Sequence, residues 1–108
     1  MEKNKKYLSD ILMAIELIEE FTNEINDFNQ YEKDRKTQSA VERQLAIIGE
    51  ALNHLKKLDS TIVIESGSQI IGFRNRLIHA YDSLDNSIIW AIINRHIKSL
   101  KIEVQNLV

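Results

Sequence analysis

The sequence predicts an all-α fold: a four-helix up-and-down bundle, folded as a single domain over residues 1–108. Proline is absent and glycine occurs only at positions 49, 67 and 72, so residues that break helices are scarce. Apolar residues recur at steps of three and four along most of the chain, which is the period of an amphipathic helix. A chain of this length buries about 65% of its unfolded surface, enough for one core and too little for two domains.

The first predicted helix is about 20 residues long and carries one apolar stripe. Ser9 or Asp10 lies near its start as a candidate cap. A polar connection over residues 26–36 follows, in which we expect a short helical turn and the docking of Phe28 or Tyr31 on the core. The apolar stripe of the first helix consists of Leu8, Ile11, Leu12, Ile15, Ile18, Phe21 and Ile25.

A second long helix is predicted to begin at a cap from Asp34 or Thr37 and to end near Lys57 or Leu58. The next segment, residues 59–68, holds the only β-branched run of the chain. A lone short strand would have no partner, so a loop or a helical turn is predicted there. The stripe of the second helix consists of Val41, Gln44, Leu45, Ile48, Ala51, Leu52 and Leu55.

A third, shorter helix is predicted from a cap at Ser66 or Ser68 to a point near Tyr81, and a fourth begins at Asp85 or Asn86. Four helices with short connections form a bundle. So small a bundle, rich in isoleucine and leucine, is expected to keep an apolar face for a partner subunit and to form a homodimer. The apolar stripe of the third helix consists of Ile70, Ile71, Phe73, Leu77 and Ile78. The stripe of the fourth helix consists of Ile88, Ile89, Ile92, His96, Ile97, Leu100 and Val104.

Composition excludes several classes of protein and site. Without cysteine the chain has neither disulfides nor thiolate metal ligands, and it has no histidine pair with zinc spacing and no glycine-rich phosphate loop, so no metal and no cofactor are expected. No signal peptide or membrane span is recognisable, which predicts a cytoplasmic protein. The net charge of −2 means that any binding of nucleic acid must come from a local basic patch.

Three single residues have structural interpretations. His96 on the fourth stripe is expected to be a hydrogen-bonded core residue, and His54 lies on the polar side of the second helix. Glu50 is expected to pair with Arg74 or Arg76 if their helices pack together. None of these three is predicted to be catalytic.

The stretch Arg74-Asn-Arg-Leu-Ile-His79-Ala-Tyr81 places two cations, an imidazole and a phenol within eight residues. Arginine can hold a phosphate and histidine can move a proton near neutral pH, as cleavage of a phosphodiester requires. A regular helix places Arg74 and His79 about 140° apart. Either a kink or a second copy of the chain could join them at one phosphate, while the structural alternative makes the arginines surface charges and Tyr81 a half-buried helix-end aromatic.

This motif, Arg-x4-His followed by Ala-Tyr, resembles the signature of the HEPN superfamily, and the tyrosine two residues after the histidine resembles its HepT branch. Two other segments are similar to HepT-like sequences in the same order. They are Asp34-Arg-Lys-Thr-Gln-Ser-Ala-Val-Glu-Arg and Ile47-Ile-Gly-Glu-Ala-Leu. The resemblance covers most of the chain.

The resemblance implies a metal-independent endoribonuclease that is the toxin of a toxin–antitoxin pair and acts on RNA as a homodimer. His79 and Arg74 would be catalytic, with Asn75 and Arg76 in support. The antitoxin would be an MntA-like nucleotidyltransferase that adenylylates Tyr81. Two alternatives stay open: a catalytically silent helical dimer that only docks such a transferase, and an ordinary helical subunit.

Overall fold

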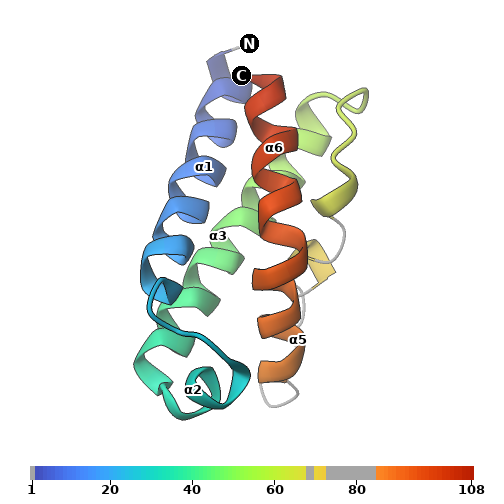
Figure 1. Ribbon diagram of the computed structural model, residues 1–108. Coiled ribbons are helices and arrows are strands. Elements are labelled where there is room, and N and C mark those ends of the chain that lie inside the picture. Colours follow the sequence, from blue (N-terminus) through green and yellow to red (C-terminus); the bar gives the residue numbers. More distant parts are fainter. Residues whose placement is uncertain (1, 68–69, 73–84) are drawn as a thin grey trace.

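The structure, a computed structural model, describes residues 2–67, 70–72 and 85–108 (Figure 1). All regular elements in these ranges are helical, which confirms the all-α bundle. Two long helices, α1 (Glu2–Thr22) and α3 (Arg35–Leu58), lie side by side, and the short helix α2 (Phe28–Lys33) that connects them in sequence packs at one end of the bundle, against α3 and the later helix α5. A third rod, built from α5 (Asn86–Ala91), a turn η3 (Ile92–His96) and α6 (Ile97–Leu107), runs alongside them and brings the two termini to the same end.

Helix α1 begins much earlier than predicted. It starts at Glu2, so Ser9 and Asp10 lie in its interior and the predicted cap at either residue is wrong. The polar first turns remain helical because glutamate and lysine are good helix formers and because Lys6 pairs with Asp10 one turn later, at 3.1 Å. The helix ends at Thr22, and Ile25, predicted to lie on its stripe, packs on the core from the connection instead.

Helix α2 carries Tyr31, one of the two aromatic residues predicted to dock on the core. Asp27 caps it by accepting a hydrogen bond from the backbone N–H of Gln30 at 2.9 Å. Tyr31 is fully buried, and its ring lies 5.3 Å from the ring of Trp90 on α5. The side-chain amide of Gln38 on α3 donates to the carbonyl of Tyr31 at 2.8 Å. These contacts hold the connection between α1 and α3 against α3 and α5.

Helix α3 has the bounds that the sequence predicts. The Asp34 carboxylate accepts from the backbone N–H of Thr37 at 3.0 Å and from its hydroxyl at 2.7 Å, and the helix ends at Leu58. The two hydrogen bonds from Thr37 lower the pKa of Asp34. After α3 the chain follows an irregular path and then forms a short 3₁₀ turn, η1 (Glu65–Gly67), so the prediction of a loop or helical turn is confirmed.

The fourth predicted helix is interrupted by a π-helical turn. Asp85 caps its start as predicted, but η3 separates α5 from α6. Within η3 the backbone N–H of Ile97 bonds to the carbonyl of Ile92, five residues back. Both isoleucines are thereby buried, whereas His96 is only half-buried. The prediction of His96 as a core residue is therefore wrong.

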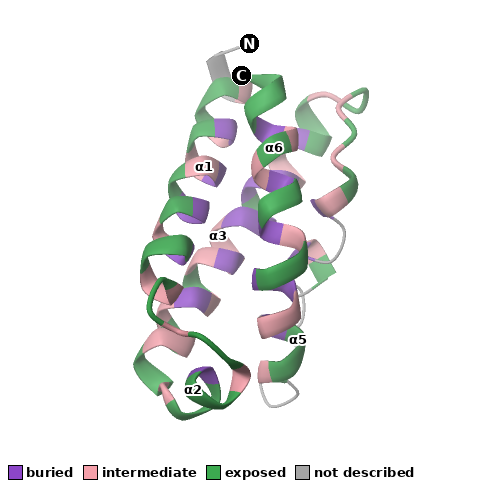
Figure 2. Cartoon of the chain, in the orientation of Figure 1, coloured by how far each residue is buried: buried purple, intermediate pink, exposed green. Residues whose placement is uncertain are grey.

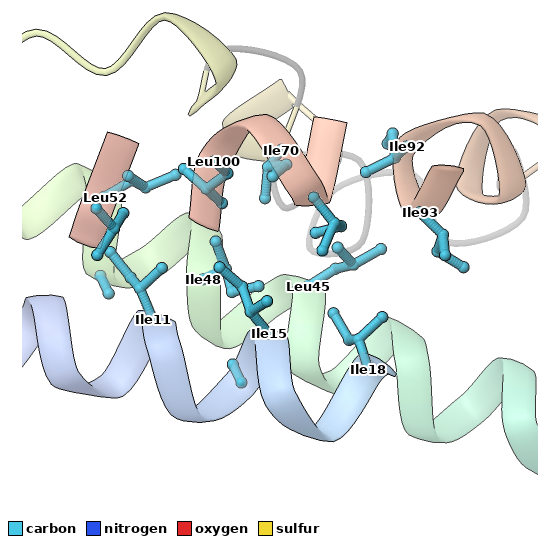
Figure 3. Close-up of a cluster of buried hydrophobic side chains, with 14 of the residues drawn as sticks. Ile11, Ile15, Ile18, Leu45, Ile48, Leu52, Ile70, Ile92, Ile93 and Leu100 are labelled. Carbon is cyan, nitrogen blue, oxygen red and sulfur yellow. The ribbon is translucent and has the colours of Figure 1, made fainter. Parts of the chain in front are cut away.

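One apolar core fills the space between these elements (Figures 2 and 3). The buried faces of the helices turn toward one another, and the outer faces are exposed (Figure 2). At the surface Lys101 of α6 pairs with Glu19 of α1 at 2.9 Å. Among the described residues, no helix has both the length and the apolar character needed to cross a bilayer. The labelled core residues in Figure 3 are Ile11, Ile15, Ile18, Leu45, Ile48, Leu52, Ile70, Ile92, Ile93 and Leu100.

The hydroxyl of Tyr31 generates a stability prediction. It is buried, and no donor or acceptor among the described residues reaches it. A buried polar group without a partner is destabilising, so Tyr31→Phe should raise the free energy of unfolding by about 1 kcal/mol. Urea denaturation followed by circular dichroism measures the change. A loss of stability in Tyr31→Phe would mean that the hydroxyl has a partner in solution.

Candidate functional site

The five residues predicted for the site, Arg74, Asn75, Arg76, His79 and Tyr81, lie outside the described residues. The arrangement predicted for them is therefore untested. What the structure does describe is how the chain is held before and after them, at residues 65–67 and 70–72 and from residue 85 onward. These two boundaries and the neighbouring surface define the candidate site.

Before the motif, the chain is held at three points. Glu103 of α6 binds the start of η1, Gly67 packs against α3, and Ile70 is fully buried in the core (Figure 3). Gly67 approaches α3 closely: a Cβ at this position would lie 3.2 Å from a methyl group of Leu52. Residues 70–72 are helical. The chain thus arrives at Gly72, two residues before Arg74, from a fixed position.

The contact with Glu103 is a cap supplied by a distant helix. The two carboxylate oxygens accept three hydrogen bonds, from the backbone N–H of Glu65 at 2.8 Å, the backbone N–H of Ser66 at 3.1 Å and the Ser66 hydroxyl at 2.6 Å. Desolvation would raise the pKa of Glu103, but these hydrogen bonds outweigh it and hold the pKa below its ordinary value. The carboxylate therefore prefers to remain charged in this position. Ser66, one of the two residues predicted to cap the third helix, donates to Glu103 of α6, and the other, Ser68, lies outside the described residues.

After the motif, Asp85 caps the next helix, α5, by hydrogen bonds from a residue close to it in the sequence. Its carboxylate accepts from the backbone N–H of Ser87 at 2.8 Å and from the Ser87 hydroxyl at 2.6 Å. These bonds, the side-chain one foremost, lower the pKa of Asp85. Helix α5 in turn packs on α2 through Trp90 and Tyr31. The segment that carries the motif is thus bounded on each side by a carboxylate that accepts backbone N–H groups.

A mostly apolar hollow of about 280 Å³ lies beside the first boundary. It is formed by the end of α3, the chain that follows it and Ile71 of the helical residues 70–72. Lys56 is the one cationic residue in its lining. The lining residues are Leu52, Leu55, Lys56, Ser60, Ile62, Val63, Ile64, Gly67 and Ile71.

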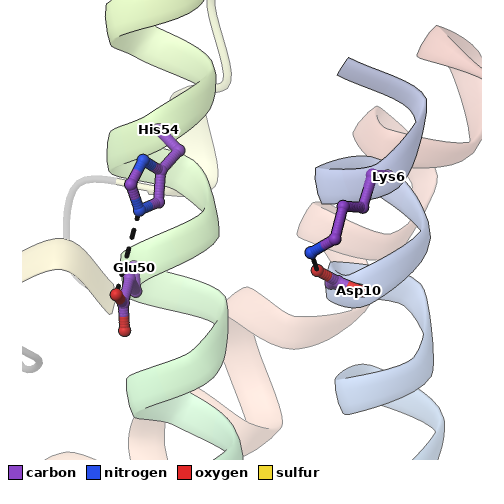
Figure 4. A network of polar contacts seen from close by, with 4 residues as sticks. All are labelled: Lys6, Asp10, Glu50 and His54. Carbon is purple, nitrogen blue, oxygen red and sulfur yellow. Dashed lines mark hydrogen bonds and ion pairs between the residues drawn. The ribbon is translucent and has the colours of Figure 1, made fainter. Parts of the chain in front are cut away.

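A second hollow, more polar, lies between α1 and α3 (Figure 4). The rings of Tyr7 and His54 are stacked there, 4.9 Å apart and 7° from parallel. Within α3, His54 Nε2 lies 3.8 Å from a carboxylate oxygen of Glu50 (Figure 4). Glu50 was expected to pair with Arg74 or Arg76, which lie outside the described ranges, and the partner that the structure shows for it is His54.

Sequence reasoning missed both the stack of Tyr7 on His54 and the contact of Glu103. Each joins residues that are far apart in the chain, 37 or 38 residues in the case of Glu103, and neither has a local pattern that would indicate it. Across residues 4–67, 70–72 and 85–108, no three side chains of the metal-binding types gather at one place.

Comparisons with known proteins agree with the resemblance seen in the sequence. Residues 11–107 match the family described as Ribonuclease HepT-like. A protein of Thermococcus cleftensis named as a probable ribonuclease HepT is 45% identical over 102 residues, which cover 91% of this chain and 89% of the relative. A candidate RNase of Methanocaldococcus jannaschii is 32% identical, with 94% of this chain and 93% of the relative covered. No solved structure gives a match.

The hydrogen bonds of Glu103 predict an acid-sensitive contribution to stability. Because the folded-state pKa is lowered, the contribution is complete above the usual value of about 4.5 and is lost as the pH falls through the folded-state value. Glu103→Gln should therefore be less stable than the natural protein at pH 7, by about 1 kcal/mol for a partly exposed cluster of bonds. Urea denaturation at pH 7 and at pH 3.5 should show this difference shrink at the lower pH. An equal difference at both values would contradict the prediction.

Proposed function

This chain belongs to the HepT-like ribonuclease family, and on that premise we propose that it is an endoribonuclease that cleaves RNA without a metal ion. The matched span, residues 11–107, includes the complete Arg-x4-His motif at Arg74 and His79. An intact pair of these two residues within a family of ribonucleases is the observation that carries the proposal. The side chains that the motif supplies are sufficient for the chemistry.

The proposed reaction uses the 2′-hydroxyl of the RNA as the nucleophile. Its oxygen forms a bond to phosphorus while the bond from phosphorus to the 5′-oxygen breaks, which gives a 2′,3′-cyclic phosphate and a 5′-hydroxyl. His79 accepts the proton of the 2′-hydroxyl or donates one to the leaving oxygen. Arg74 holds the phosphate and stabilises its added negative charge. Asn75 orients the imidazole or a phosphate oxygen, and Arg76 adds positive charge nearby.

We propose further that the active unit is a homodimer. On one regular helix Arg74 and His79 project about 140° apart, so a single copy does not aim both at one phosphate. Two copies that face each other can combine Arg74 of one with His79 of the other.

The biological role that we propose is that of a toxin in a toxin–antitoxin pair. The antitoxin would be an MntA-like nucleotidyltransferase that adds adenylyl groups to Tyr81. The added phosphate would lie two residues from His79 and would exclude RNA by its bulk and by like charge.

A second candidate function is a binding module, a catalytically silent helical dimer that only docks a nucleotidyltransferase. It predicts tight association with the transferase and no cleavage of RNA. The complete Arg74 and His79 pair favours the enzyme, because a scaffold does not need both side chains.

Substitution of the catalytic pair tests the proposal directly. His79→Ala and Arg74→Ala should each lower the rate of RNA cleavage by about 10²-fold or more, because each removes a proton-transfer group or the charge that stabilises the transition state. The assay is cleavage of a fluorescent oligoribonucleotide in the presence of EDTA, with circular dichroism to show that both variants are folded. If folded His79→Ala cleaves as fast as the natural protein, the mechanism is wrong.

The same two variants also test the shared site. When they are mixed and allowed to exchange subunits, a heterodimer has one site that combines Arg74 of one subunit with His79 of the other. Cleavage should then return to a substantial fraction of the natural rate. If each site lies within one subunit, the mixture should stay as inactive as its components.

The control of activity by Tyr81 is tested by intact mass. Coexpression with an MntA-like nucleotidyltransferase should add one or more adenylyl groups to the natural chain and abolish its cleavage of RNA, because of the charge and bulk added beside His79. Tyr81→Phe should gain no adenylyl group and should remain active after coexpression. Tyr7→Phe is the matched control, since it removes a phenol on α1 and should leave the modification in place.

A further inference from the structure

The polar hollow between α1 and α3 holds a cluster of side chains that the proposed reaction does not use (Figure 4). Its volume, about 290 Å³, is at the lower end for a small-ligand pocket and suits one flat ring system. The rings of Tyr7 and His54, 4.9 Å apart and 7° from parallel, form an aromatic wall. Tyr7 covers one face of the imidazole, yet the His54 side chain is still 45% exposed. Its other face is therefore available to a further stacked ring.

A carboxylate lies at the edge of this aromatic platform. His54 Nε2 is 3.8 Å from a carboxylate oxygen of Glu50, one turn earlier on α3. A ring stacked on the imidazole would thus present its edge to Glu50. The two oxygens of a carboxylate can accept two parallel N–H groups, and guanine is the RNA base whose Watson–Crick edge offers two adjacent N–H donors. The other three bases offer one donor group beside an acceptor, which a carboxylate oxygen would repel.

Cations flank Glu50 along the outer face of α3. Arg43 and Lys57 lie seven residues before and after it, and all three residues are exposed. Seven residues of an α-helix return to the same face within about 20° and advance about 10 Å. The face thus carries a cation, a carboxylate and a cation in one line. This line matches one nucleotide of a single strand, with the base edge at the carboxylate and the flanking phosphates at the cations.

We propose that this surface is a subsite for a guanine base of single-stranded RNA. His54 is the stacking platform and Glu50 accepts the N1–H and the 2-amino group. Within the lining Lys6 pairs with Asp10 at 3.1 Å, so the carboxylate of Glu50 leaves the hollow negative when His54 is neutral, which favours a base edge there over a phosphate. The subsite rests on the proposed ribonuclease function for its ligand, and it adds a preference for guanosine in the bound strand.

Binding is measured with labelled heptanucleotides of 2′-O-methyl ribose, which the proposed reaction cannot cleave because the 2′-hydroxyl is blocked. A strand of uridines with guanosine at its centre should bind about 10-fold more tightly than the same strand with inosine, which lacks only the 2-amino group. Glu50→Gln should bind the two strands within about 2-fold of each other. Glu20→Gln, a matched change at an exposed position of α1, should keep the natural preference. Fluorescence anisotropy gives the dissociation constants.

The stack and the cations are tested by separate variants, each shown to be folded by circular dichroism. His54→Ala should weaken the binding of every strand about 10-fold, whereas His54→Phe, which keeps a ring in place, should retain most of the affinity. Arg43→Gln and Lys57→Gln should weaken the guanosine and inosine strands equally and reduce the dependence of binding on salt. If His54→Ala does not fold, the results for Glu50→Gln and for the two cation variants decide the question.

Equal affinity of the natural protein for the guanosine and inosine strands would overturn the proposal, as would a preference that persists in Glu50→Gln. If 5′-GMP binds as tightly as the guanosine strand, the ligand is a free nucleotide and the RNA subsite is wrong. If arginine amide binds and neither strand does, the hollow takes a guanidinium group of a protein, and the proposal also fails. Cleavage plays no part in these measurements. A protein that shows the expected preference and cleaves no RNA would refute the proposed function and keep the subsite.

Discussion

Burial of one continuous apolar stripe on each helix is the constraint on which the whole structure depends. Within the described ranges the core is formed by apolar side chains and the ring of Tyr31. Such a core sets the rotation of each helix, because each stripe must face the other helices. The π turn η3 shows how strong the constraint on rotation is. The buried residues of the last rod include Ile92 and Ile97, five positions apart, and a regular helix would turn one of them away from the core.

Carboxylates at the ends of helices determine where the helices begin. Asp27, Asp34 and Asp85 each accept backbone N–H groups from the turn that follows them in the chain. Glu103 does the same from a different helix, and it is the only one of the four whose partners are remote in sequence. Local caps decide where a helix begins. A remote cap also decides where that helix lies relative to another, which is why the turn before the motif is held differently from the turn after it.

These two kinds of interaction explain what could be predicted from the sequence. The stripes and the caps at Asp34 and Asp85 could be predicted because each depends on residues three or four positions apart. The apolar stripe does not predict the start of α1, because the helix extends back to Glu2 through polar residues. The helix propensity of these residues and the pair of Lys6 with Asp10 stabilise this first part. The π turn and the contact of Glu103 depend on packing between elements, which no local spacing encodes. For the site, residue chemistry and resemblance predict Arg74, His79 and Tyr81, which lie outside the described residues, and the contact of Glu103 with the turn before them could be found only from the fold.

The charge of the protein connects the proposed dimer with the proposed control. A net charge of −2 gives the whole molecule no attraction for RNA, so binding requires a local concentration of cations. One motif supplies two arginines, Arg74 and Arg76, and in the proposed dimer two facing motifs would supply four. Dimerisation would therefore create the RNA site electrostatically as well as geometrically. An adenylyl group on Tyr81 carries one negative phosphate into each motif, so modification would weaken the same local field on which RNA binding depends. Because the net charge of the chain is −2, no net positive charge on the rest of the molecule would compensate for that loss.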